Sequence, residues 1–249
     1  MKNVFKIILT LLIVIPTISC DSESETPKAP TAIVPPVTTT PPLVPKTINY
    51  LALGDSYTIG QSVCETCNYP EQLQRNLSNT YPATSFSLKI IAKTGWTTSN
   101  LLSAINTENH GSNYDLVTLL IGVNNQFQNI PFSVYEKEFP ELVNKAITLA
   151  KEEKSNVIVI SIPDYAYTPF GQSSAYNNKQ ISLEIDKYNA FAENYCKNNN
   201  IIFISITDIT RQGLSNPSLV TQDGLHPSQS AYTLFVERIL PKVKFTYKE

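Results

Sequence analysis

Several residue types that build common functional sites are scarce in this chain of 249 residues. It has only two histidines, one tryptophan, one methionine and four cysteines. A zinc site would need more His and Cys ligands than this supply offers, so no metal is expected. Charged residues make up 16% and the formal net charge is −2. Because the sequence has no basic stripe, recognition helix or RNA-binding signature, nucleic acid is not an expected partner.

The sequence also has no apolar run long enough to cross a membrane. Its main apolar run lies close to the N-terminus. A short basic start, with Lys2 and Lys6, precedes an apolar run from Ile7 to Ile15. This run is too short for a typical transmembrane helix and has the length of a signal-peptide core. It ends at Thr17-Ile18-Ser19-Cys20, which resembles a bacterial lipobox. We therefore predict a lipoprotein signal peptide over residues 1–20 with lipidation of Cys20; a general signal peptide is the alternative.

Residues 21–46 have a different composition from the rest of the chain. An acidic start is followed by seven prolines among Thr, Ala and Val. Such a segment cannot bury enough apolar surface to offset the entropy of ordering, so we predict a disordered Pro/Thr-rich tether. Together with Cys20, it predicts a protein bound to the membrane through an N-terminal lipid anchor in the bacterial cell envelope, at the outer membrane. The tether does not distinguish a periplasmic from a surface-exposed orientation.

The cysteines that follow Cys20 fit an oxidising compartment. Cys64 and Cys67 have the spacing of a redox motif or of half a zinc site, but there is no second pair of this kind. The preferred interpretation is a local disulfide that closes a loop. Cys196 is then expected to be buried and free.

From Thr47 onward, short apolar runs alternate with longer amphipathic segments. Five such alternations predict a single three-layer α/β domain over residues 47–249, built on a five-stranded parallel sheet. The expected strands are 47–53, 86–92, 115–121, 156–162 and 201–206. The expected helices are 69–80, 98–108, 132–153, 177–199 and 228–241. Sites in such sheets form at the carboxyl ends of the strands, so the residues after each strand are the ones to examine.

Small and polar residues follow the first three expected strands. Gly54-Asp55-Ser56 comes after the first and places a hydroxyl at the strand end. Gly95 follows the second strand, and a glycine there lets a backbone N–H approach a ligand closely. After the third strand comes Asn124, whose amide can donate to a developing oxyanion without titrating. Each of these residues taken alone is equally consistent with a turn or a helix cap.

An acid and a histidine lie close together near the C-terminus, as Asp223-Gly-Leu-His226. A separation of three residues on one turn lets the carboxylate reach Nδ1 of the imidazole and direct Nε2 toward a nucleophile. His110 lies in a polar loop and is expected to be a solvated surface residue. Asp164, after Pro163, is expected to open a turn rather than act as the catalytic acid.

Four segments, in this order along the chain, resemble the four blocks of the SGNH/GDSL hydrolase superfamily, a group of serine esterases and lipases. They are Gly54-Asp55-Ser56, Gly95, the segment with Asn124, and Asp223-Gly-Leu-His226. The resemblance covers the chain from about Thr47 to the C-terminus and implies a flavodoxin-like α/β/α sandwich. It implies a nucleophile at Ser56, activated by His226 and Asp223, with no cofactor. The implied oxyanion hole combines the N–H groups of Ser56 and Gly95 with the amide of Asn124. Asn125 departs from the family pattern, which often has Asp there.

The resemblance implies hydrolysis of small-molecule or glycan esters, with short-chain acyl or sugar O-acetyl esters as the expected substrates. Residues expected to contact the substrate are Asp55, Trp96, Tyr165 and Tyr167. Alternatives within the family are a lysophospholipase or a thioesterase. An alternative of another class is a catalytically inactive, glycan-binding lipoprotein on the same fold. The sequence leaves the acyl group and the oligomeric state open.

Overall fold

The structure is a computed structural model that describes residues 47–107, 110–173, 175 and 177–245. The predicted signal peptide, the lipidation of Cys20 and the tether lie outside these residues. In the described part of the chain, no helix is both long enough and apolar enough to span a membrane.

Five parallel strands form one sheet in the order β2-β1-β3-β4-β5. The strands are β1 (Thr47–Gly54), β2 (Ser85–Ala92), β3 (Leu116–Leu120), β4 (Val157–Ile160) and β5 (Ile202–Ile204). All five lie where the sequence predicted them, to within two residues at each end. Every residue of β3 and β4 is buried, because helices cover both faces of the sheet there. The strand order is that of the flavodoxin-like fold.

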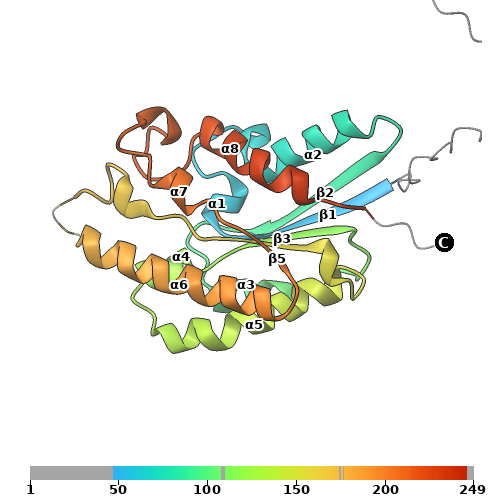
Figure 1. The fold of residues 1–249 in the computed structure, drawn as a ribbon, viewed down its shortest axis with the longest axis horizontal. Coiled ribbons are helices and arrows are strands. Elements are labelled where there is room, and N and C mark those ends of the chain that lie inside the picture. The colour runs from blue at the N-terminus through green and yellow to red at the C-terminus, as the bar shows by residue number, and fades with distance from the viewer. Residues whose placement is uncertain (1–46, 108–109, 174, 176, 246–249) are drawn as a thin grey trace, which may run out of the picture. The chain divides into compact units, whose positions relative to one another are not determined.

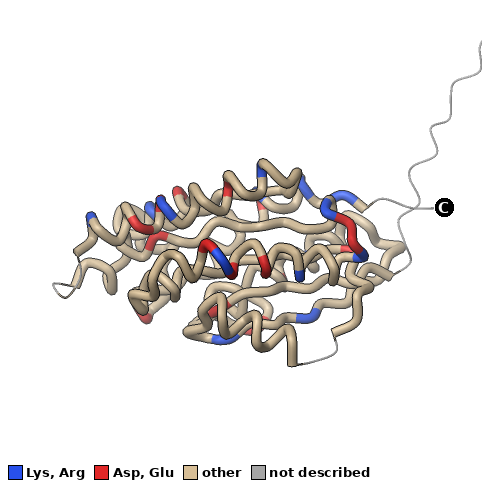
Figure 2. Tube along the Cα trace, turned by 90° about the horizontal axis from the view of Figure 1, so that it is seen from below, with Lys and Arg blue, Asp and Glu red and all other residues tan. Residues whose placement is uncertain are grey.

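Helices cover both faces of this sheet, as Figure 1 shows. α2 (Tyr69–Thr80) and α8 (Gln229–Ile239) pack together on one face. α3 (Thr98–Thr107), α5 (Phe132–Leu149) and α6 (Asn178–Asn198) cover the other. The predicted three-layer α/β/α sandwich is therefore confirmed. Acidic and basic residues are interspersed along the described part of the chain (Figure 2).

The long helices follow their predicted ranges, with one clear difference at the end of α5. The apolar pattern predicted a helix to residue 153, but α5 ends at Leu149. Lys151 and Glu152 both adopt positive φ values, of 61° and 58°, which no α-helix accommodates. The apolar face of α5 is as predicted, with Phe139, Leu142, Val143 and Ala146 all buried.

Three short helices have no counterpart in the prediction, and each directly follows a strand or its turn. They are α1 (Ser56–Ile59), α4 (Val123–Phe127) and α7 (Thr207–Thr210). Four or five residues are too few to display a helical period, so the sequence pattern could not reveal them. Two of them matter for the site, because α1 begins at Ser56 and α4 carries Asn124.

Candidate active site

Ser56, Asp223 and His226 come together at the carboxyl end of the sheet. Ser56 is the first residue of α1, directly after β1, and is almost fully buried. Its Oγ lies 3.1 Å from Nε2 of His226, across 170 positions of sequence. Nδ1 of His226 lies 2.7 Å from Oδ2 of Asp223. These two contacts form a continuous hydrogen-bonded chain from carboxylate to imidazole to hydroxyl, in the order that a Ser-His-Asp site requires.

The Asp223 carboxylate is held by several donors. Its Oδ1 accepts hydrogen bonds from the hydroxyl of Thr221 at 2.6 Å and from the backbone N–H groups of Leu225 and His226, at 2.8 and 2.9 Å. Its Oδ2 accepts from the hydroxyl of Ser62 at 2.6 Å, in addition to the contact with His226. Partial burial alone would raise the pKa of Asp223, but the hydrogen bonds from Ser62, Thr221 and His226 outweigh it and hold this pKa well below its usual range. Asp223 is therefore ionised at neutral pH and can stabilise a positive charge on the imidazole.

The predicted oxyanion residues border the same pocket as Ser56 and His226. This pocket has a volume of about 180 Å³, and most of its other walls are apolar or aromatic. It is lined by Ser56, Tyr57, Thr94, Gly95, Val123, Asn124, Phe127, Tyr165, Leu225 and His226. Gly95 has a φ of 80° and so occupies a backbone conformation that favours glycine.

Asn124 has hydrogen-bond partners within the protein. Its Nδ2 donates to the carbonyl of Trp96 at 3.0 Å and lies 3.5 Å from Oδ2 of Asp55. A primary amide carries two hydrogens, so one is used in the short bond to Trp96 and the other in the longer bond to Asp55. The Trp96 carbonyl thereby ties the segment after β2 to the segment after β3.

Both polar atoms of the Asn125 amide, where the family often has Asp, form hydrogen bonds beside this site. Its Oδ1 accepts from the backbone N–H of Thr98 at 2.9 Å, and its Nδ2 donates to the Thr98 hydroxyl at 2.6 Å. That hydroxyl in turn donates to Glu138 of α5. Asn125 thus fastens α4 to the start of α3, close to Gly95.

Of the four residues predicted to contact the substrate, one lines the pocket and three do not. Tyr165 lines the pocket. Asp55 is fully buried and caps α1 by accepting from the N–H of Tyr57 at 2.9 Å. Trp96 packs against the core and does not line the pocket, but its carbonyl accepts the hydrogen bond from Asn124. Tyr167 is 38% exposed and lies away from the pocket, with the guanidinium of Arg211 5.9 Å from its ring centre.

Four expectations outside the pocket have clear outcomes. Cys64 and Cys67 form a disulfide, and Cys196 is buried and free, as predicted. Asp164 opens a turn by capping the N–H of Ala166, also as predicted. The expectation for His110 was wrong: it is buried, with Nδ1 2.9 Å from Nζ of Lys89. A polar loop sequence did not reveal that the ring folds back onto α3.

Other residues at the site were not predicted from the sequence. Ser62 and Thr221 bind the carboxylate, while Phe127 and Leu225 form walls of the pocket. Phe127 is 40% exposed and meets Tyr165 edge-on, with their ring centres 5.7 Å apart. Ser62 and Phe127 could not be identified from neighbouring residues, because their partners Asp223 and Tyr165 come from distant segments.

The sheet and its strand order define a flavodoxin-like α/β/α fold, and the Ser-His-Asp arrangement lies at its carboxyl edge. The sequence model of the GDSL-like lipase/acylhydrolase family matches residues 52–234. The chain belongs to this family, and at this general level it is a hydrolase of esters.

Solved structures show the same fold at low sequence identity. TesA superposes with a TM-score of 0.61 at 15% identity, covering 79% of this chain and 98% of that one. LAE5, an alpha/beta hydrolase from the metagenome of Lake Arreo, Spain, has a TM-score of 0.59 at 17% identity, covering 78% and 94%. Axe2, an acetylxylan esterase from Geobacillus stearothermophilus, has a TM-score of 0.57 at 17% identity, covering 80% and 95%. No curated protein sequence matches the chain.

Proposed function

We propose that the protein is a serine esterase that works through an acyl-enzyme on Ser56. The observation that carries this proposal is the hydrogen-bonded chain from Asp223 through His226 to Ser56, with contacts of 2.7 and 3.1 Å, at the wall of an apolar pocket. A glycan-binding protein on the same fold would not require these three side chains to be aligned. The alignment therefore favours catalysis over an inactive binding role.

In this mechanism, His226 accepts the proton of the Ser56 hydroxyl while Oγ attacks the ester carbonyl. Asp223 stabilises the imidazolium that forms and holds the ring so that Nε2 faces Oγ. The imidazolium then donates its proton to the departing alcohol, which leaves an acyl group on Ser56. Water activated by His226 attacks this acyl group and restores the free enzyme. The protein residues supply every proton transfer in this scheme.

The negative charge on the carbonyl oxygen would be held by three donors: the N–H groups of Ser56 and Gly95 and the amide of Asn124. The oxyanion would take the place of Asp55 in the long bond of 3.5 Å that this amide now makes. Support comes from their place around one pocket and from the Trp96 carbonyl, which fixes the Asn124 amide in orientation. Donors that are held in place before the reaction need no reorganisation during it, and each is typically worth about 3 kcal/mol of barrier.

The pocket supports a short acyl group as the substrate's acid component. Its volume of about 180 Å³ is below the range of roughly 300–1,000 Å³ that is usual for drug-sized ligands. Val123 and Leu225 provide an apolar lining for a methyl or short alkyl chain, and Phe127 borders the opening. The exposed Phe127 ring offers a surface for a sugar or aryl alcohol. We therefore favour acetyl and other short-chain esters, including sugar O-acetyl esters, over lysolipids and long-chain thioesters.

A panel of substrates tests both parts of this proposal, the acyl-enzyme on Ser56 and the preference for short acyl groups. The soluble domain is assayed with p-nitrophenyl esters of increasing acyl length, acetylated xylan, a lysophospholipid and an acyl-CoA. We expect turnover that declines with acyl length and release of acetate from the polysaccharide. Ser56→Ala should abolish turnover and labelling by a fluorophosphonate probe, whereas Ser103→Ala, an exposed serine of α3, should change neither. Labelling or turnover that persists in Ser56→Ala would refute the assignment of the nucleophile.

We also propose that the protein is tethered to the bacterial envelope through lipid on Cys20. The support is the sequence of residues 1–20 and the Pro-rich segment after it. Metabolic labelling with an alkyne fatty acid should mark the wild-type protein and not Cys20→Ala. Equal labelling of the two would contradict the anchor.

A further inference from the structure

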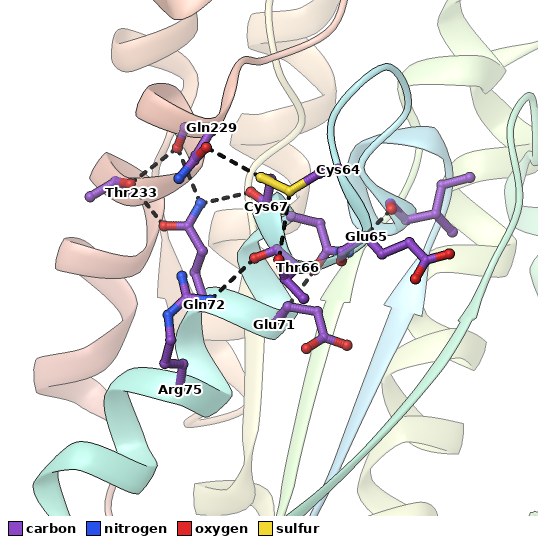
Figure 3. Close-up of a disulfide and its surroundings, with 11 residues drawn as sticks. Cys64, Glu65, Thr66, Cys67, Glu71, Gln72, Arg75, Gln229 and Thr233 are labelled. Carbon is purple, nitrogen blue, oxygen red and sulfur yellow. Dashed lines mark hydrogen bonds between the residues drawn. A yellow bond between two sulfur atoms is a disulfide. The ribbon is translucent and has the colours of Figure 1, made fainter.

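A loop closed by the disulfide adjoins the site. We call residues 60–68 the cystine loop; it joins α1, which begins with Ser56, to α2. Cys64 and Cys67 are bonded within it, around a single turn of 3-10 helix (Figure 3). The proposed reaction uses none of its residues.

One side chain of this loop reaches the proposed catalytic acid. The hydroxyl of Ser62 donates to Oδ2 of Asp223 at 2.6 Å, across 161 positions of sequence. This is the same oxygen that lies 2.7 Å from Nδ1 of His226. The other donors to Asp223 come from its own segment, residues 221–226. Because the Asp223 side chain is 29% exposed, burial does not fix its orientation, and Ser62 is the contact that ties it to a different element.

The backbone conformation at Ser62 is one that favours glycine. Its φ is 68°, in the left-handed region that glycine adopts without steric strain and that other residues seldom occupy. A serine here is less favourable for folding than a glycine, yet its hydroxyl points to the site. This combination indicates that the hydroxyl itself is used.

The rest of the cystine loop is fastened on two sides. The carbonyl of Cys67 accepts from Nε2 of Gln72 at 2.7 Å, and the same Nε2 donates to the carbonyl of Gln229 at 3.1 Å. Figure 3 shows this junction between the loop and the start of α8, which begins three residues after His226. On the other side, Oε1 of Gln61 accepts from the hydroxyl of Thr94 at 2.6 Å, next to Gly95. The loop thus touches the segments that carry the acid, the base and the oxyanion glycine.

We infer that Ser62 is a positioning residue of the active site, which acts through Asp223 and is held in place by the cystine loop. This inference rests on the proposed function. The Ser62 hydroxyl fixes Oδ2 of Asp223 against Nδ1 of His226, which keeps Nε2 on the Ser56 hydroxyl. The disulfide restricts the backbone of the loop two residues further along, so that Ser62 stays in reach.

Two substitutions at this position separate positioning from folding. Ser62→Gly removes the hydroxyl but suits the backbone, so kcat for p-nitrophenyl acetate should fall about tenfold while Tm stays equal or rises. KM should hold, because Ser62 does not line the pocket. Ser62→Thr keeps the hydroxyl but places a β-branched residue at positive φ, so Tm should fall while kcat stays well above that of Ser62→Gly.

A matched control lies at the opposite end of the sheet. Asn200, between α6 and β5, also has a positive φ, of 58°, and is exposed. Asn200→Gly should leave kcat unchanged, with Tm equal or higher. If kcat followed Tm in all three variants, or if Ser62→Gly kept the full kcat, the inference would be overturned.

Reduction tests the part played by the disulfide. Dithiothreitol exchanges with Cys64–Cys67 and is itself oxidised to its cyclic disulfide, which leaves two protein thiols. We expect it to lower the kcat of the wild type several-fold, and to leave the already lowered kcat of Cys64→Ser/Cys67→Ser unchanged. Full activity of the reduced protein would overturn the role of the disulfide. A wild type that never turns over ester would instead refute the proposed function, which separates the two failures.

Discussion

Replacing Asp55 with asparagine should stabilise the protein, and by an amount that depends on pH. Asp55 is fully buried beside Ser56, and this burial raises its pKa from 3.8 to about 7, although hydrogen bonds from Tyr57 and Asn124 oppose the rise. A carboxyl group in the unfolded chain keeps a pKa near its ordinary value. The folded state therefore holds a proton between pH 4 and 7 that the unfolded chain has already lost.

The magnitude follows from this difference between the two states. Raising the pKa from 3.8 to about 7 makes ionisation of Asp55 roughly 4 kcal/mol less favourable in the folded protein than in the unfolded chain. Because the folded state binds more protons in this window, the stability contribution of Asp55 falls as pH rises from 4 to 7. Asparagine does not ionise and can still accept the hydrogen bond from the N–H of Tyr57. The free energy of unfolding of Asp55→Asn relative to wild type should rise through this window and level off above pH 7.

Urea denaturation of both proteins at intervals between pH 4 and pH 9 measures the difference. Contributions from titratable groups that both proteins share cancel in this difference in the free energy of unfolding. Asp208→Asn is a control of opposite sign, since the hydrogen bonds from Arg238 lower the pKa of Asp208 despite partial burial. That variant should be less stable than wild type at neutral pH, by under about 1 kcal/mol because the pair is exposed. A difference between Asp55→Asn and wild type that stays constant across the pH range would refute the reasoning.

Two further substitutions test the scaffold around the site. Gly122→Ala should cost about 2–4 kcal/mol of stability in urea denaturation, because φ is 126° and a Cβ would lie 2.6 Å from the buried ring of Tyr135. Gly111→Ala, also at positive φ but with its nearest contact at 3.5 Å, should lose about 1 kcal/mol, and an equal loss in both would contradict the steric argument. Arg211→Met leaves the fully buried carboxylate of Asp164 without its partner at 2.9 Å and should cost about 3 kcal/mol. The exposed pair of Arg238 and Asp208 is the comparison, and Arg238→Met should lose less than about 1 kcal/mol.

Local sequence was enough to predict the layers of the fold. The segments that became β3 and β4 are apolar at nearly every position, which only a strand covered on both faces requires. The rule that parallel strands place their carboxyl ends at one edge then brought Ser56, Gly95 and Asn124 together. Asp223 and His226 could be paired because three positions separate them and a single turn joins them.

Contacts between distant segments were beyond that reasoning. Trp96 and Tyr167 lie in segments near the site, but neither lines the pocket: Trp96 packs against the core, and Tyr167 lies beside Arg211. Phe127 lines the pocket. No sequence pattern indicated it, because α4 is too short to show a helical period.

The sequence by itself therefore determined the α/β class of the protein and indicated the three residues that we propose as acid, base and nucleophile, because periodicity and motifs within a few residues carry that information. Only the tertiary structure decided what surrounds them: the size of the pocket, the burial of Asp55 and the hydroxyl of Ser62 on Asp223. Each of these depends on how loops from different strands meet at the sheet edge. No spacing along the chain encodes such a meeting, because it follows from packing the whole domain.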